Sequence, residues 1–127
     1  MIALDYQSRV PIYRQIEDRV LELILLGEYT SDTQLPSVRS LAVELGINPN
    51  TIQKAYQELE QDGIIYTVTG KGSFVRGVER AKEQLRQKAT QQLRQALREA
   101  KMAHLPLDQA LELVRTEYQH GEVTKHD

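Results

Sequence analysis

At 127 residues the chain has room for one small domain and an appendage, because single domains usually run to about 100–150 residues. The 40% apolar content is ordinary for a soluble globular protein, and the longest nearly uncharged stretch, residues 20–27, is far too short for a membrane span. The net charge is −2, and residues 1–77 carry seven basic against ten acidic side chains, so binding of a polyanion would depend on a few well-placed cations. Cysteine is absent and residues 1–5 show no signal-peptide pattern, so we expect a cytoplasmic protein without disulfides or thiolate metal ligands.

The first predicted helix begins near Pro11. Proline suits the first turn of a helix, and apolar residues follow at three- and four-residue steps until Gly27, a residue typical of helix ends. These apolar residues form a single core-facing stripe: Ile12, Ile16, Val20, Leu23 and Ile24.

Two short helices joined by a tight turn are predicted next. Ser37 suits the N-cap of the first helix, which ends at Gly46. Asn48-Pro49 suits the start of the second, which ends at Asp62-Gly63. The apolar sides of the two helices consist of Leu41, Ala42 and Leu45, and of Ile52, Ala55, Tyr56 and Leu59. Two helices joined by a turn that contains glycine are typical of a helix-turn-helix.

A β-hairpin is predicted directly after these helices. Residues 64–68 and 73–75 are rich in β-forming side chains, and they flank the segment Thr69-Gly70-Lys71-Gly72. The glycines permit positive φ and a close approach of a partner to the backbone, although an ordinary exposed turn has much the same composition. Because the hairpin follows a helix-turn-helix, we predict a winged helix-turn-helix domain over residues 1–77.

Residues 78–127 are predicted to form a helical tail, which makes the fold mostly α with a small β-hairpin wing. Residues 78–102 lack glycine and proline and predict a helix of about 25 residues, roughly 38 Å long. A second amphipathic helix is predicted after Pro106 and is expected to end before Gly121.

The apolar stripe of the tail allows two interpretations. It could fold back onto the winged-helix domain of residues 1–77, the head, as additional core. It could instead pair with the same stripe of a second chain. Pairing is favoured, because so long a helix projects beyond a head of this size and would leave leucines in water. We therefore expect a homodimer whose interface contains Leu85, Ala89, Leu93, Ala96, Leu97, Ala100, Leu107, Leu111 and Val114.

The exposed side of the third predicted helix is the best candidate for a binding surface. Its side chains are mostly amides and hydroxyls, which suit base edges and phosphates in a major groove. Arg39 is predicted in the first turn of the second helix, where the helix dipole disfavours a cation, which favours an external phosphate as its partner. The alternative is an intramolecular pair with Glu58 or Glu60. The predicted DNA-binding residues are Ser37, Arg39, Asn48, Asn50, Thr51, Gln53, Lys54, Thr69, Gly70, Lys71 and Gly72.

Catalytic and metal-binding patterns are absent from the sequence. His104, His120 and His126 show no repeated ligand spacing, and the carboxylates are typical of helix surface charge. We therefore predict no enzyme activity, no cofactor and no metal ion.

The motifs of residues 9–76 resemble, in order and spacing, the GntR family of bacterial winged-helix regulators. The matching segments are residues 11–16, 35–42, 48–52 and 70–75. The resemblance implies that Arg39 contacts the DNA backbone or a guanine, that residues 48–54 enter the major groove, and that residues 70–72 reach the minor groove. Pro49 and Gln53 replace basic residues of many relatives, so the base preference does not transfer.

By its length and pattern, the tail is similar to that of the YtrA-type branch of this family, in which two helices serve dimerisation. This resemblance implies a dimeric repressor of an inverted-repeat operator on double-stranded DNA. A small-molecule effector of unidentified chemistry is also expected, although a two-helix tail should offer little concave volume for it. The competing hypothesis is a winged-helix protein-interaction module that does not bind DNA, which the acidic head favours.

Overall fold

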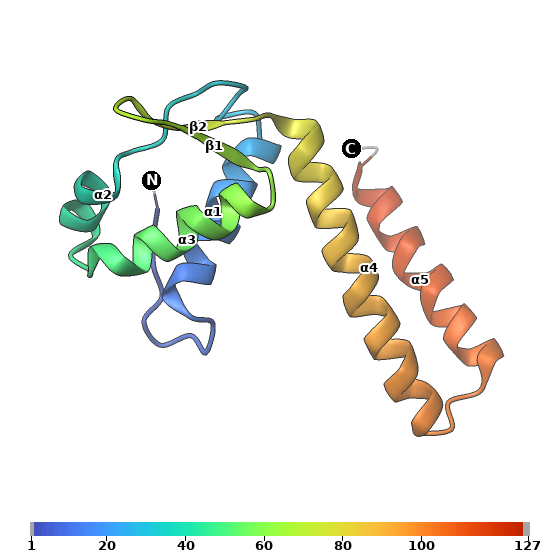
Figure 1. Cartoon of the computed structure of the whole chain (residues 1–127). Coiled ribbons are helices and arrows are strands. Elements are labelled where there is room, and N and C mark those ends of the chain that lie inside the picture. Colours follow the sequence, from blue (N-terminus) through green and yellow to red (C-terminus); the bar gives the residue numbers. More distant parts are fainter. Residues whose placement is uncertain (1, 126–127) are drawn as a thin grey trace. The chain divides into compact units, whose positions relative to one another are not determined.

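A computed structural model of the chain describes the backbone of residues 2–125 and the side chains up to residue 120 (Figure 1). The elements described are α1 Ile12–Leu25, α2 Val38–Leu45, α3 Pro49–Gln61, β1 Ile65–Val68, β2 Gly72–Val75, α4 Val78–Met102 and α5 Leu107–Lys125. The chain divides into two compact units, Met1–Gln87 and Lys88–Asp127, and the boundary falls inside α4. The first turns of α4 therefore belong to the N-terminal unit.

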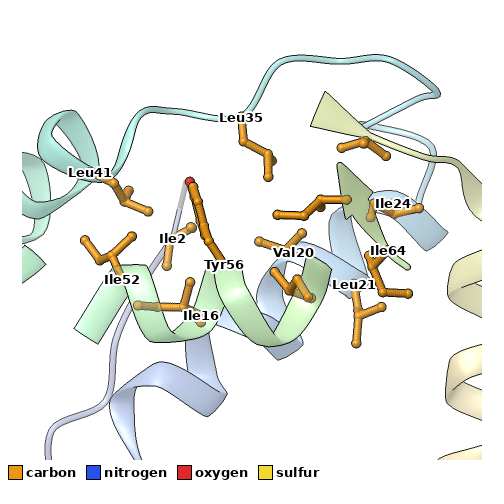
Figure 2. Close-up of a cluster of buried hydrophobic side chains, with 14 of the residues drawn as sticks. Ile2, Ile16, Val20, Leu21, Ile24, Leu35, Leu41, Ile52, Tyr56 and Ile64 are labelled. Carbon is orange, nitrogen blue, oxygen red and sulfur yellow. The ribbon is translucent and has the colours of Figure 1, made fainter. Parts of the chain in front are cut away.

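The core of the N-terminal unit is built from the apolar stripes of the three short helices and from the hairpin. Figure 2 shows that side chains from the N-terminal segment, α1, α2, α3 and the loop before α2 converge on one cluster. Burying each large apolar side chain contributes about 1.5–3 kcal/mol relative to leaving it in water, so this cluster dominates the stability of the unit. Its most deeply buried large members are Ile16, Val20, Ile24, Leu35, Leu41, Ile52, Leu59, Ile64, Ile65 and Val75.

Local sequence fixes the turn between α2 and α3. The Ser37 hydroxyl accepts a 3.0 Å hydrogen bond from the Ser40 N–H, and the Asn48 carboxamide accepts one of 2.8 Å from the Asn50 N–H. Gly46 ends α2 with a φ of +67°, in the left-handed region that favours glycine. The caps predicted from the sequence are thus confirmed, and the turn is confined to residues 46–48.

The wing is attached to the loop that leads into α2. Strands β1 and β2 are antiparallel, with Val68 opposite Gly72 at the tip. The outer edge of β2 is covered by residues 32–35, where the Leu35 N–H donates a 2.9 Å hydrogen bond to the Ser73 carbonyl oxygen. The loop therefore adds a short third segment to the ladder and ties the wing to the start of α2.

The beginning of α4 packs onto the N-terminal unit. Ala81 is completely buried, and Leu85, one turn further along the same face, packs partly buried against the same core. For this part of the stripe the structure shows additional core, not a free pairing surface. Leu85 was expected among the interface residues but lies against the head, because it follows Ala81 on the same side of the helix.

The second unit is a helical hairpin made from the rest of α4 and from α5 (Figure 1). The helix α5 continues through Gly121 to Lys125, so the predicted end before Gly121 is wrong. One glycine costs a helix only about 1 kcal/mol relative to alanine, which does not stop it. Between residues 88 and 120 no side chain is buried, so the described hairpin has no core of its own. None of the described helices is long and apolar enough to span a membrane.

Candidate nucleic-acid interface

The N-terminal half of α3 presents the polar face that the sequence predicts. Asn50, Gln53 and Lys54 are exposed and Thr51 is partly exposed, whereas the opposite side of the helix is buried in the core. Asn48 is exposed as well, but its carboxamide oxygen already caps the helix. The amide N–H groups of Asn48 can still donate to an external acceptor.

Lys54 is held in place by an aromatic ring from α1. Its Nζ lies 4.1 Å from the centroid of the Tyr13 ring, which is within the range of a cation–π contact. The sequence analysis did not select Tyr13 as a functional residue, because its position in the chain says nothing about a neighbour forty residues away. The contact fixes the ammonium group of the exposed Lys54 side chain beside the ring of Tyr13.

Arg39 lies in the first turn of α2 with an exposed side chain. It makes no hydrogen bond or ion pair with any residue in the described part of the chain, so the alternative of a pair with Glu58 or Glu60 is not found. Glu58 instead forms a side-chain hydrogen bond with Glu17 of α1. The guanidinium of Arg39 is therefore available to an external anion.

The wing tip is an exposed turn of Thr69, Gly70 and Lys71, and the partly buried Gly72 begins β2. The Lys71 N–H closes the turn with a 2.9 Å hydrogen bond to the Val68 carbonyl oxygen. The side-chain amide of Gln34 donates a 2.8 Å hydrogen bond to the Lys71 carbonyl oxygen. Gln34 was missed by the sequence analysis, since only the pairing of its loop with β2 brings it to the tip.

The carboxyl groups of Glu17 on α1 and Glu58 on α3 interact with each other. Glu17 is 8% exposed, and its burial, together with the hydrogen bond and the charge of Glu58, raises the pKa of Glu17 to about 8. The positive charge of Arg14 on the same helix opposes this shift and is outweighed. At pH 7 most of the Glu17 carboxyl is therefore protonated, and the head is less negative than its formal charge, which eases the approach of a polyanion.

Hollows large enough for a small molecule lie in both units of the described chain. One, of about 610 Å³, lies in the N-terminal unit and is lined by residues that include Asp32, Tyr66, Arg76 and Arg80. Another, of about 460 Å³, is an apolar groove between α4 and α5. The expectation that the tail offers little concave volume is therefore wrong. Small side chains, such as Ala96, leave a trough between the two helices.

The described histidine, aspartate and glutamate side chains form no group of three or more that could hold a metal ion. His104 lies in the turn between the tail helices, and His126 lies outside the described residues.

The arrangement defines a class of protein. A recognition helix with an exposed polar face, an available arginine at the start of the preceding helix and a lysine-tipped hairpin together form a winged helix-turn-helix, a DNA-binding module. The chain belongs to the family described as bacterial regulatory proteins, gntR family, whose model matches residues 12–75. It is a transcription regulator that binds DNA, and its family is one of regulators, not enzymes.

Two curated relatives come from Bacillus subtilis. The HTH-type transcriptional repressor YtrA is 48% identical over 75 residues, which cover 59% of this chain and 58% of YtrA. The uncharacterized HTH-type transcriptional regulator YhcF is 34% identical over 112 residues, which cover 87% of this chain and 93% of YhcF. The chain thus aligns with little more than half of YtrA but with most of YhcF.

Solved structures agree with this assignment. A GntR family transcriptional regulator from Listeria monocytogenes has a TM-score of 0.67 and 33% identity, covering 89% of this chain and 98% of that chain. The DNA-binding domain of AraR in complex with operator ORR3 has a TM-score of 0.51 and 30% identity, covering 57% of this chain and 88% of that chain.

Proposed function

We propose that this protein is a homodimeric repressor that binds an inverted-repeat operator. The observation that carries the proposal is the exposed polar face of α3, together with Arg39 of α2, which has no partner among the described residues. Support for repression comes from YtrA, which is named a repressor, and support for an operator comes from AraR, whose DNA-binding domain was solved with one. The proposed DNA-binding residues are Ser37, Arg39, Asn48, Asn50, Thr51, Gln53, Lys54, Thr69, Gly70, Lys71 and Gly72.

Each part of the surface has a separate role in this proposal. The amides of Asn50 and Gln53 suit bidentate hydrogen bonds to the N6 and N7 positions of adenine in the major groove. Arg39 binds a phosphate or a guanine. Lys54, whose ammonium group lies against the Tyr13 ring, binds the DNA backbone. Lys71 at the wing tip supplies one further phosphate contact in or beside the minor groove. Because the head carries no net positive charge, Arg39, Lys54 and Lys71 supply the positive charge at the DNA contact.

Dimerisation is supported by the exposed apolar surface of the second unit. Leu93, Leu97, Leu111 and Val114 are each 40–49% exposed, and they lie on a hairpin with no buried side chain between residues 88 and 120. A hairpin that cannot bury its own leucines gains stability from a partner with the same surface. A second copy of this chain is that partner, and it covers Ala89, Leu93, Ala96, Leu97, Ala100, Leu107, Leu111 and Val114 in a bundle of four helices.

Two-fold symmetry links the dimer to the operator. An interface between identical surfaces relates the two chains by a two-fold axis, so the two α3 helices face half-sites of inverted sequence. Such half-sites lie about one helical turn apart, roughly 34 Å, or a multiple of that spacing. The proposal therefore predicts an inverted repeat and not a direct one.

A small-molecule effector belongs to the proposal as well. The 610 Å³ hollow in the N-terminal unit falls within the usual range of ligand pockets, about 300–1,000 Å³. Its lining includes Tyr66, Arg76 and Arg80, and the charges of the two arginines suit a small organic anion. Arg80 also forms a 3.5 Å ion pair with Glu83. Asp32 accepts a 2.7 Å hydrogen bond from the Tyr66 hydroxyl and keeps that ring in place.

The test is a gel shift of the full chain against the DNA upstream of its own gene, at low and moderate salt, followed by selection from a random duplex library. Retardation that survives excess non-specific DNA, with an inverted repeat in the selected duplexes, is the expected result. Failure to bind any duplex at low salt would favour the protein-interaction module instead, and a pull-down would then identify its partner.

A further inference from the structure

Gln34 connects the wing tip to the segment that starts α2. Its side-chain amide donates a 2.8 Å hydrogen bond to the backbone carbonyl oxygen of Lys71, across 37 residues of sequence. A Cβ atom placed on Gly72 would lie 2.8 Å from the same amide nitrogen, so the carboxamide is seated closely on the backbone of the turn. Gly72 has a φ of +126°, and a side chain there would both strain the backbone and displace Gln34.

The backbone holds Gln34 in this place without help from its side chain. Gln34 forms a β-bridge with Phe74, and Leu35 next to it bonds the Ser73 carbonyl oxygen. The N-cap of α2, Ser37, follows three residues after Gln34, and Arg39 follows five residues after it. The Gln34 carboxamide thus bonds the backbone at Lys71 of the wing to the chain segment that reaches Arg39 five residues later.

We infer that Gln34 is a positioning residue that fixes Lys71 relative to Arg39, so that both cations meet the phosphates of one duplex at a set spacing. The inference rests on the proposed function. A tip with glycines on both sides of Lys71 is free to adopt many conformations, and ordering it on DNA would cost conformational entropy. The bond from Gln34 orders the backbone before DNA arrives, and such preorganisation increases affinity without any contact between Gln34 and the duplex.

The binding effect is separable from an effect on folding. Gln34 is exposed, and a hydrogen bond in water contributes little to the stability of the folded state. Gln34→Met keeps the length of the side chain and the backbone bridge to Phe74 but removes the donor. Gln61→Met is the matched control, because Gln61 is exposed at the end of α3 and lies outside the proposed contact surface.

The experiment is a double-mutant cycle in DNA affinity with the full chain. Wild type, Gln34→Met, Lys71→Ala, the double variant and Gln61→Met are titrated by fluorescence anisotropy against the strongest duplex that the wild type selects from a random library. The salt concentration is varied in each titration, and the thermal midpoint of each protein is recorded. The salt slope counts the phosphate contacts that are retained.

We expect Gln34→Met to weaken binding about three- to tenfold and to lower the salt slope by about one contact, as Lys71→Ala does, with a thermal midpoint close to that of Gln61→Met. The double variant should bind no more weakly than Lys71→Ala alone. Losses that add in the double variant, or an affinity of Gln34→Met equal to that of Gln61→Met, would overturn the positioning role while DNA binding stands. A wild type that selects no duplex overturns the proposed function, and this inference with it.

Discussion

The phenol of Tyr56 on α3 donates a 2.7 Å hydrogen bond to the backbone carbonyl oxygen of Pro36, the residue before the N-cap of α2. Figure 2 shows the Tyr56 side chain extending from α3, with its hydroxyl oxygen directed toward the segment that leads into α2. Tyr56 is 5% exposed, and this burial raises the pKa of its hydroxyl above the ordinary value. One part-buried bond from the core-facing side of α3 thus connects this helix with the helix start that carries Arg39.

Removal of this hydroxyl tests the connection. We expect Tyr56→Phe to lower the free energy of unfolding by about 1–2 kcal/mol, because the Pro36 carbonyl loses a buried partner. For a unit of this size, each kcal/mol of lost stability lowers the thermal midpoint by roughly 4–8 °C. Tyr118→Phe, at a side chain that is 71% exposed, is the control and should leave the midpoint unchanged. Equal midpoints for both variants would mean that the bond contributes nothing.

Arg39 is the proposed DNA contact whose removal gives a direct test of the candidate surface. Arg39→Ala should weaken binding of the selected duplex by about 1–3 kcal/mol, because the contact loses an exposed guanidinium that has no partner in the described part of the chain. The thermal midpoint should not change. Arg98→Ala removes the same charge from an exposed position of α4 and should bind nearly as wild type. Wild-type affinity in Arg39→Ala would remove this residue from the DNA surface.

The apolar face of the second unit predicts the oligomeric state. Leu97 is 45% exposed, and a carboxylate in its place would be buried without a partner in a dimer, at a cost of several kcal/mol. We expect Leu97→Asp to sediment as a monomer at micromolar concentration. The control Gln91→Asp adds the same charge at an exposed position of α4 and should remain dimeric. A dimeric Leu97→Asp would show that the chains associate through another surface.

The buried carboxyl pair predicts a pH dependence of stability. The pKa of Glu17 is about 8 in the folded protein, against an ordinary value of 4.5, so the folded state holds a proton that the unfolded chain releases. The stability that this proton contributes is complete below pH 4.5 and is lost as the pH rises to 8, by at most about 1.4 kcal/mol per pH unit. Besides Glu58, the charged side chains that shift this group are Arg14 and Asp18 on its own helix.

Glu17→Gln mimics the protonated carboxyl and should flatten this part of the profile. Urea denaturation of wild type, Glu17→Gln and Glu60→Gln between pH 5 and 9 measures the effect, and Glu60 serves as an exposed carboxylate on α3. Wild type and Glu60→Gln should lose stability in parallel as the pH rises. A Glu17→Gln profile parallel to theirs would contradict the assignment of the bound proton to this pair.

Local sequence predicted the elements of this fold well, for reasons that operate within a few residues. Ser37 and Asn48 cap their helices through their own neighbours, and Gly46 ends α2 because a left-handed φ suits glycine. The long helix Val78–Met102 has the predicted bounds. The end of α5 was misjudged at Gly121, where the preference of one residue was weaker than continued helical hydrogen bonding.

The polar face of α3, the arginine of α2 and the lysine-tipped hairpin were thus determined by the sequence alone, because periodicity and capping set which side chains face outward. Tertiary structure alone decided which of them are supported: Tyr13 beneath Lys54, Gln34 on the Lys71 carbonyl, Tyr56 on Pro36 and Glu58 against Glu17. It also placed Leu85 against the head core. These pairs are distant in the chain, and their contacts depend on how α1, α3 and the wing pack together, which no local pattern encodes.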